Sequence, residues 1–384
     1  MKNAKTRHVI VFDPIPFHGG SKVATRHAME QTRPDIHYHV LSASAESWRV
    51  SQSKNICIQQ LIIPAWLANQ TQGQGYWLKQ MYLLLWLMPY TLCVALRNIS
   101  KPEKLLLASG PGVDFAGYVL ARLTGLGLVQ LVHGSVGASR ASRWCVAQGH
   151  RTFYLESAQH SLQALFDNQT LPQHFEPFVN GLPEYLWPQQ LKPNAFDSPH
   201  LFWAASLLKW KGLDLLIDTL KSNQLNQQLR STICFIRPQK TTAEVTKAPV
   251  TLPNCQWHQS PNNIDDLRAL ANIYVSTSQQ EPFGLSTLEA MAAGLIVVIP
   301  ADGAYWDRHL RHDHSCLKYQ AGDVSDLNQT LSHICDNLKH YKNIGINGQK
   351  IAKQYRAEIT YRAIARAIEQ PPNSIPTNAT GELS

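Results

Sequence analysis

The sequence predicts an α/β protein built from two doubly wound domains. Three observations lead to this prediction: the chain has 384 residues, short apolar runs alternate with helical patterns, and the alternation begins again after about residue 190. A domain usually takes about 100–200 residues, so the length is sufficient for two. Strands separated by helices are typical of parallel sheets with right-handed crossovers.

In the first half of the chain, three apolar runs predict buried strands. They are His8–Phe12, Leu105–Ala108 and Leu128–His133. Apolar residues with helical spacing follow the first run at Ser21–Gln31 and the second run at Phe115–Leu123. We therefore expect strand–helix units in which helices cover a parallel sheet.

The second half repeats this arrangement. Strands are expected at Leu201–Ala205, Ile233–Ile236, Ile273–Ser276 and Ile296–Ile299. Helices are expected at Leu213–Leu220 and at Leu285–Ala293, and Gly294 would end the latter because glycine is favoured after the last helical residue. The segment Asn180–Asn194 between the halves is rich in Pro and Asn and is the expected linker.

Composition excludes several classes of protein. Hydrophobic residues make up 44% of the chain and charged residues 16%, which excludes a largely disordered protein. The seven cysteines are scattered and form no CxxC pair, so we expect neither a disulfide framework nor a structural zinc site. The apolar run near the N-terminus has five residues, too short for a signal peptide. A reducing cytoplasm is the expected location.

Positive charge is concentrated on the N-terminal side. The chain has a net charge of +8, and residues 1–150 alone hold 15 basic and 6 acidic residues. This bias favours an anionic partner, either a phosphate-bearing substrate or an anionic membrane, although solubility explains it equally well. Nucleic acid is not an expected partner, because the basic residues are dispersed rather than gathered on one predicted helix.

One apolar segment, Met81–Leu96, has two interpretations. Its 16 residues carry no charge. It is shorter than the roughly 20 residues needed to span a bilayer, and Pro89 interrupts it. We favour a buried helix. The alternative is a partly exposed apolar and aromatic face, with Tyr76, Trp77 and Lys79 nearby, that rests on a membrane interface.

The stretch Ser276–Gly294 is the strongest candidate for chemical function. A helix begins there after Gly284, whose missing side chain allows close approach of the backbone. The first turn of a helix presents unpaired N–H groups and the positive end of the helix dipole, which suit a phosphate. Glu289 lies one turn inside this helix, where it can accept the two hydroxyls of a ribose. Glu281 precedes the helix, on the side where a sugar attached to the phosphate would project.

The motif EPFGLSTLEAMAAG at residues 281–294 resembles the glutamate-pair motif of retaining glycosyltransferases with the GT-B fold, in the group-one (family-four) class. In that family the first glutamate contacts sugar hydroxyls and the second binds the ribose, and these roles fall on Glu281 and Glu289. The backbone after the first glutamate approaches the sugar and the diphosphate. The resemblance therefore implies that Phe283, Gly284 and Leu285 bind the donor.

The same resemblance implies an overall architecture. We expect two Rossmann-like domains facing across a cleft, with a C-terminal helix that crosses back to the first domain. The expected limits are an acceptor domain at residues 1–186, a nucleotide-sugar donor domain at 187–351 and a crossover helix packing on the N-terminal domain at 352–369. Residues 370–384 are expected to form a disordered tail.

Basic residues for the diphosphate are expected in Phe202–Leu220, which is similar to the start of the family's second domain. An arginine and a lysine usually neutralise the diphosphate there. Lys211 matches the lysine, whereas Ser206 stands at the position of the arginine. Either Lys209 supplies the second charge or diphosphate binding is weaker than usual, because arginine and lysine are not equivalent on phosphate.

Three residues of the first domain complete the expected site. Gly19 and Gly20 follow the first strand and match a glycine pair that lets the backbone approach a phosphate or sugar. His133 ends a predicted strand at the sheet edge where ligands bind, and it matches a histidine that contacts the transferred sugar. His133 and Glu281 are the expected catalytic residues. The fifteen other histidines show no metal-binding spacing, and enzymes of this fold use no catalytic metal, so we expect no metal and no cofactor.

The expected function is a retaining glycosyltransferase that moves a sugar from a nucleotide diphosphate sugar to a saccharide or lipid-linked saccharide. Bacterial surface polysaccharide biosynthesis (exopolysaccharide, O-antigen or lipopolysaccharide) is the expected pathway, in the cytoplasm or peripherally at the inner face of the inner membrane. A nicotinamide dehydrogenase would need GxGxxG after the first strand, where HGGSK stands instead. A nucleotide-sugar epimerase, or a non-catalytic nucleotide-sugar-binding subunit favoured by Ser206, remains the alternative.

Overall fold

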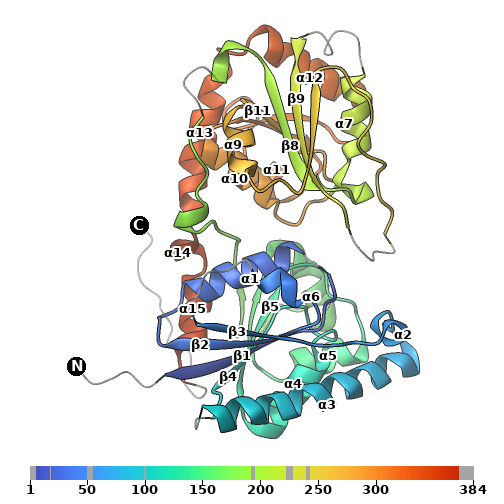
Figure 1. The fold of residues 1–384 in the computed structure, drawn as a ribbon, viewed down its shortest axis with the longest axis vertical. Coiled ribbons are helices and arrows are strands. Elements are labelled where there is room, and N and C mark those ends of the chain that lie inside the picture. Colours follow the sequence, from blue (N-terminus) through green and yellow to red (C-terminus); the bar gives the residue numbers. More distant parts are fainter. Residues whose placement is uncertain are drawn as a thin grey trace, which may run out of the picture. The chain divides into compact units, whose positions relative to one another are not determined.

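The computed structural model describes residues 6–17, 19–49, 55–98, 101–191, 195–221, 228–238 and 243–371. The chain forms two compact units, Met1–Phe178 together with Tyr361–Ser384, and Val179–Thr360. Each unit is a parallel sheet covered by helices (Figure 1). The predicted α/β class with two doubly wound domains is therefore confirmed.

The first unit is built on one sheet whose strand order, among the described residues, is β3-β2-β1-β4-β5-β6-β7. All neighbouring strands run parallel. The order reverses between β1 and β4, and ligands of doubly wound sheets bind beside the carboxyl ends of the strands at such a reversal. The strands are β1 (Arg7–Asp13), β2 (Ile36–Ser42), β3 (Ile56–Gln60), β4 (Lys104–Leu107), β5 (Gly127–Val132), β6 (Arg151–Tyr154) and β7 (Phe175–Pro177).

Helices cover both faces of this sheet. Figure 1 shows α1 on one face and α3 and α4 on the other. Side chains of α3, including Leu83 and Leu87, are buried against Ile10 and Leu105 of the sheet. The helices are α1 (Gly20–Glu30), α2 (Ala65–Ala68), α3 (Gly73–Arg97), α4 (Phe115–Thr124), α5 (Arg140–Val146), α6 (Gln159–Leu165) and α15 (Arg362–Glu369), with short 3-10 turns η1 (Ala45–Trp48) and η2 (Glu156–Ala158).

The second unit repeats the plan with the strand order β10-β9-β8-β11-β12-β13 in its described part, again parallel throughout. Helices α7 and α12 lie on one face, and α9, α10 and α13 on the other (Figure 1). The strands are β8 (His200–Ser206), β9 (Arg230–Ile236), β10 (Cys255–Gln259), β11 (Ile273–Val275), β12 (Ile296–Ala301) and β13 (Leu317–Gln320). The α-helices are α7 (Leu213–Leu220), α9 (Ile264–Ala269), α10 (Leu285–Ala293), α11 (Tyr305–His309), α12 (Val324–Asp336), α13 (Lys342–Ala352) and α14 (Ala357–Thr360), and the 3-10 turns are η3 (Glu184–Leu186), η4 (Ala195–Asp197), η5 (Lys209–Lys211) and η6 (Lys353–Tyr355).

Every strand and helix expected from apolar periodicity is present, with small shifts at the ends. The strands β2, β3, β6, β7, β10 and β13 were not expected. In β3 and β10 most side chains are partly or fully exposed, so these strands lack the continuous apolar run that marks a buried parallel strand.

The expected crossover helix at 352–369 is instead three short helical segments, η6, α14 and α15. The break falls at Arg356, which is extended and pairs with Leu182 in a parallel bridge. Contacts group residues 179–186 with the second unit and residues from Tyr361 onward with the first. Of the expected tail at 370–384, residues 372–384 lie outside the described part of the chain, as do residues 192–194 of the expected linker.

The uncharged segment Met81–Leu96 belongs to the 25-residue helix α3. Within the described residues, this is the one helix long and apolar enough to cross a membrane, yet only 28% of its apolar window is buried. Leu83 and Leu87 are fully buried, whereas Leu85 is 70% exposed. The favoured interpretation of a buried helix therefore holds for one face alone, and the other face is exposed and apolar.

Replacing buried Leu87 by alanine is expected to lower the free energy of unfolding by about 2–5 kcal/mol, because a cavity opens in the core. The same change at exposed Leu85 should cost less than about 0.5 kcal/mol. Urea unfolding followed by circular dichroism measures both values. Equal losses for the two variants would contradict the assignment of the two faces.

Candidate functional site

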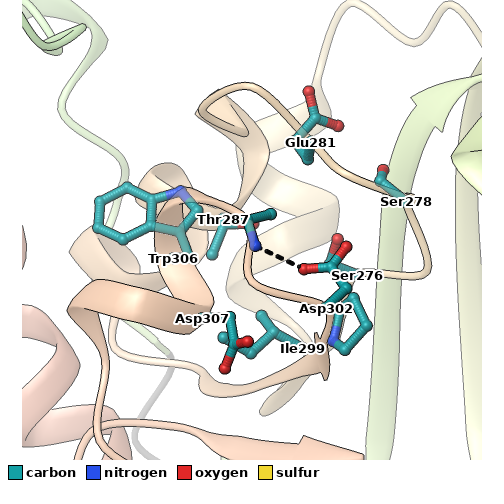
Figure 2. A pocket seen from close by; sticks show the side chains of 10 residues that line it. Ser276, Ser278, Glu281, Thr287, Ile299, Asp302, Trp306 and Asp307 are labelled. Atoms are coloured by element: carbon teal, nitrogen blue, oxygen red, sulfur yellow. Dashed lines mark hydrogen bonds between the residues drawn. The ribbon is translucent and has the colours of Figure 1, made fainter. Parts of the chain in front are cut away.

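The main candidate site lies where β11 leads into α10, at the carboxyl edge of the second unit's sheet. Figure 2 shows Ser278 and Glu281 on the connecting loop, with Trp306 of α11 among the residues that line the same pocket. This position at the strand ends is the one that doubly wound sheets use for ligands. The pocket is lined by Ser276, Ser278, Glu281, Thr287, Ile299, Pro300, Asp302, Ala304, Trp306 and Asp307.

The start of α10 has the form of an anion site. Gly284 precedes the helix with φ +78°, and no side chain caps the first turn. The Trp306 indole N–H donates to the Gly284 carbonyl over 3.0 Å, which fixes the loop. A Cβ atom at this position would lie 3.2 Å from Glu281 Cγ, so the site favours glycine for space as well as for conformation. The free N–H groups of the first turn, beginning at Leu285, suit a phosphate.

Phe283 anchors the loop before α10 through its side chain. Its side chain is 3% exposed and packs against Tyr305, Trp306 and Tyr355. This aromatic cluster leaves the ring no contact with the pocket surface, and it anchors the loop just before the helix. The expectation that the backbone at Phe283 acts on a ligand stays a prediction.

Glu281 and Lys211 form an ion pair, and both side chains are largely buried at 19% and 18% exposure. The Lys211 ammonium also lies 4.0 Å from the centre of the Trp210 ring. The two residues were expected at different parts of the donor, Glu281 at the sugar and Lys211 at the diphosphate. The structure brings them into direct contact, so the lysine charge and the glutamate carboxylate act as one unit.

The ion pair depends on a close approach between two connections. Gly212 follows Lys211 with φ +72°, and a Cβ atom there would lie 2.0 Å from the Thr277 carbonyl oxygen. The Thr277 hydroxyl donates to the Lys211 carbonyl over 2.8 Å and accepts from the Trp203 indole over 3.0 Å. Only glycine lets η5 lie on the loop after β11, and this contact holds Lys211 beside Glu281.

Glu289 is held by an arginine that sequence analysis missed. Arg268 of α9 donates to Glu289 Oε2 over 2.5 Å, and its own side chain is 3% exposed. Burial raises the pKa of Glu289, and the Arg268 charge opposes this shift. Among the described residues, Arg268 is the only donor to this carboxylate, which leaves Oε1 for a ligand. In the sequence Arg268 is an ordinary helical arginine, and nothing there connects it with Glu289.

Ser206 is the last residue of β8, at the same sheet edge. Lys209, the expected substitute for the absent arginine, is bound to Asp214 at 2.7 Å. This hydrogen bond raises the pKa of Lys209. A further cation lies nearby in the sheet, because Ile236 pairs in register with Ser206 and Arg237 follows it. The Arg237 guanidinium donates to the Ala248 carbonyl over 2.8 Å.

In the first unit, Gly19 and Gly20 lie at the start of α1, where no side chain caps the helix. A Cβ atom on Gly20 would meet nothing within 4 Å, so open space lies beside this helix start. A buried ion pair fixes the connection: Lys22 Nζ lies 2.5 Å from Asp13 Oδ2 and 2.7 Å from the Ile15 carbonyl. Burial lowers the pKa of Lys22. Sequence analysis missed this pair.

His133 directly follows β5, as expected. Its Nε2 lies 3.2 Å from the Thr25 hydroxyl of α1, and its ring packs edge-on against Phe178 at 5.5 Å. The Nδ1 atom is buried without a hydrogen-bond partner. Burial lowers the pKa of His133 to about 4, so the ring is neutral near pH 7.

Asp114 holds the connection after β4 at the carboxyl edge of the first unit's sheet. The sequence did not single out this residue. Its side chain is fully buried, and Oδ2 accepts the backbone N–H groups of Ser109 and Gly110 over 2.8 and 2.9 Å. Burial raises the pKa of Asp114 to about 7.

Among the residues that the structure describes, no three His, Cys, Asp or Glu side chains gather in a way that could hold a metal ion.

Residues 189–351 match the sequence model of a family described as glycosyl transferases group 1. This range contains Lys211, Glu281, Gly284 and Glu289. The match supports the expected resemblance to group-one glycosyltransferases over the second unit. No curated protein matches the chain.

Solved structures with the same fold cover both units. The Anabaena protein HepE in complex with UDP-glucose is 15% identical, with 94% of this chain and 99% of that chain covered and a TM-score of 0.68. WaaG, a glycosyltransferase involved in lipopolysaccharide biosynthesis, is 15% identical with coverage of 94% and 99% and a TM-score of 0.64. The lipopolysaccharide outer core galactosyltransferase WaaB is 10% identical with coverage of 94% and 99% and a TM-score of 0.63. At these identities the likeness establishes the fold, and the predicted GT-B fold is confirmed.

Replacing Gly212 by alanine is expected to destabilise the second unit and to displace Lys211, because the new Cβ would collide with the Thr277 carbonyl. The backbone strain alone costs about 1–3 kcal/mol. Gly125→Ala is the matched control, with φ +68° and nothing within 4 Å of its Cβ. Thermal unfolding compares the two variants, and a loss at position 212 no greater than that at 125 would contradict the close approach.

The low pKa of His133 predicts a pH dependence of stability. The ring titrates at about 4 in the folded chain and at 6.5 in the unfolded chain, so the unfolded chain binds the extra proton between these values. Stability should therefore fall as pH drops from about 6.5 to 4. His133→Gln should remove up to about 3 kcal/mol of this fall. Urea unfolding at pH 7 and 4.5 tests this, and an unchanged fall in the variant would speak against a buried neutral ring.

Proposed function

We propose that this protein is a retaining glycosyltransferase of the group-one (family-four) class that transfers a sugar from a nucleotide diphosphate sugar. Support comes from the family match over residues 189–351 and from neighbours of the same fold, one of which is in complex with UDP-glucose while two others are glycosyltransferases. The observation that carries the proposal is the Lys211–Glu281 ion pair next to the uncapped start of α10.

The diphosphate would bind between Lys211 and the first turn of α10. An ammonium has three N–H donors, and Lys211 gives one to Glu281, which leaves two for phosphate oxygens. The helix dipole and the free N–H groups after Gly284 add positive potential at the same place. Glu281, oriented by the lysine, would accept hydroxyls of the transferred sugar. Both groups would therefore act on adjacent parts of one donor molecule.

The ribose would bind to Glu289. Arg268 occupies Oε2, opposes the rise that burial causes in the pKa of Glu289 and holds the carboxylate in one orientation. The remaining oxygen would accept ribose hydroxyls. We assign Arg268 as a positioning residue, since it acts on the donor through Glu289.

In the proposed transfer, the acceptor hydroxyl oxygen bonds to the anomeric carbon as the bond from that carbon to the diphosphate oxygen breaks. The hydroxyl proton passes to the departing phosphate oxygen on the same face of the sugar, which retains the anomeric configuration. Lys211 and the start of α10 would neutralise the charge that develops on the diphosphate. His133, which directly follows β5 and is neutral near pH 7, would contact the transferred sugar. The proposal requires no metal and no cofactor.

For the acceptor we propose a saccharide or lipid-linked saccharide of bacterial surface polysaccharide biosynthesis, on the cytoplasmic side of the membrane. The basic character of the first 150 residues and the lipopolysaccharide enzymes among the structural neighbours support this choice. Ser206 in place of arginine leaves Lys211 as the main charge on the diphosphate.

A thermal-shift screen of the full chain against UDP, GDP, ADP, CDP and NAD tests donor binding. One nucleoside diphosphate at about 100 times its dissociation constant should add about 2.7 kcal/mol of stability. Glu289→Ala should lose this gain, whereas Glu358→Ala, an exposed glutamate in the same unit, should keep it. Stabilisation by NAD alone, or by no nucleotide, would contradict the proposal.

Turnover separates an enzyme from a binding subunit. The chain should release the nucleoside diphosphate from its donor when a membrane extract supplies acceptors. If the chain binds the donor but releases no nucleoside diphosphate in the presence of the extract, a non-catalytic nucleotide-sugar-binding protein is favoured.

A further inference from the structure

The exposed face of α3 forms a continuous apolar stripe. Its members are Trp77, Met81, Leu85, Met88, Leu92 and Leu96, which are 42% to 70% exposed. They recur every three or four residues and therefore lie on one side of the helix. A water-exposed helix in a soluble protein normally presents polar residues on this side, so the stripe indicates a partner.

The stripe continues onto the segment before α3. Ile62 and Trp66 are 62% and 64% exposed. This segment is tied to α3 at two points: the Tyr82 hydroxyl donates to the Ile62 carbonyl over 2.6 Å, and the Lys79 ammonium donates to the Ala68 carbonyl over 2.6 Å. Two tryptophans thus stand at one end of the stripe, and tryptophan favours the interface between water and lipid.

The surroundings of the stripe are basic. Helices α2, α3, α4 and α5 carry five Lys or Arg residues, and one of these, Arg143, is paired with Asp167. Of the two acidic residues between β3 and β6, Asp114 is fully buried and Glu103 is paired with Arg7. The sequences of α2, α3, α4 and α5 contain no Asp or Glu. This helical layer can therefore attract an anionic surface with no acidic side chain of its own to oppose it.

The geometry excludes a membrane-spanning role for α3. Leu83 and Leu87 on its inner face are fully buried in the core with strands β1 and β4. A helix held along a sheet can present one side to lipid, but it cannot be surrounded by lipid. Two copies meeting through this layer would bring like charges together, which disfavours a dimer as the occupant.

We propose that the stripe on α3, extended by Ile62 and Trp66, docks the first unit onto an anionic membrane surface with the helix lying in the interface. Apolar side chains would enter the boundary between headgroups and acyl chains, and the surrounding cations would contact anionic headgroups. This inference does not depend on the proposed transferase activity.

The docked helix would be connected to the carboxyl edge of the sheet. The Tyr76 hydroxyl donates to the Gly112 carbonyl over 2.7 Å, and Gln80 accepts from the Ala116 N–H over 3.0 Å. Gly112 belongs to the connection that Asp114 organises. If the proposed function holds, a lipid-anchored acceptor would meet the protein at the membrane on this side.

Flotation of the full chain with vesicles tests the proposal. Vesicles of phosphatidylcholine with phosphatidylglycerol should carry the protein upward, and vesicles of phosphatidylcholine alone should carry much less. Because each leucine contributes apolar area, Leu85→Gln with Leu92→Gln should weaken vesicle binding about tenfold or more. Ile346→Gln with Ile359→Gln, at exposed positions of the second unit, is the matched control and should bind like the parent chain.

Several results would overturn the proposal. These are absence of flotation with the anionic vesicles, equal binding by the Leu85 and Leu92 variant, or a dimer in solution that this variant disrupts. Circular dichroism and nucleotide-induced thermal shifts on the same variant establish that it is folded and that the second unit still binds its ligand. If the parent chain binds a nucleotide but does not float, this inference fails and the proposed function stands. If the parent chain floats but binds no nucleotide, the proposed function fails and this inference stands.

Discussion

The candidate site of the second unit depends on the close approach of Gly212 to the Thr277 carbonyl. Any side chain at position 212 would collide with that oxygen, which lies 2.0 Å from the position of a Cβ atom. Through this contact Lys211 meets Glu281, 70 residues further along the chain. Without it, the two would be separate surface charges, each well solvated and weakly interacting. The ion pair and the uncapped start of α10 then form one surface suited to a diphosphate and its sugar.

Buried charges hold the connections in both units. Asp13 pairs with Lys22 in the turn before α1, and Arg268 pairs with Glu289 between α9 and α10. Ion pairs of this kind add little net stability, because removing two charges from water costs about as much as their attraction returns. Their effect is to orient. The Asp13–Lys22 pair fixes the turn before α1, and the Arg268–Glu289 pair fixes the Glu289 carboxylate on α10.

Helix α3 carries apolar residues on its buried side and also on its exposed side. Leu83 and Leu87 are buried in the core of the first unit, whereas Leu85 and Leu92 on the outer side are exposed. The outer side chains leave apolar surface in water, which is unfavourable for a free soluble protein. Helix α3 and its neighbouring helices α2, α4 and α5 carry no acidic side chains, so this apolar surface is combined with positive charge alone.

Much of the fold could be predicted from the sequence because apolar periodicity reports local burial. The strands β1, β4, β5, β8, β9, β11 and β12 were expected on this basis, whereas β2, β3, β6, β7, β10 and β13 were not. The strands β3 and β10 are half exposed, so their apolar pattern is weak. The helix start at Gly284 and the position of His133 after β5 also followed from the sequence alone. A motif specified the residues Lys211, Glu281 and Glu289, but it did not specify their partners.

Those partners were decided by the tertiary structure. Lys211 with Glu281, Arg268 with Glu289, and Asp13 with Lys22 are pairs between separate connections, and only the packing of strands and helices determines which connections meet. The orientation of α3 was equally hidden in the sequence. A helix that is apolar on all sides has no polar face to mark its solvent side, so the buried and exposed faces became distinct only when one of them packed against the sheet.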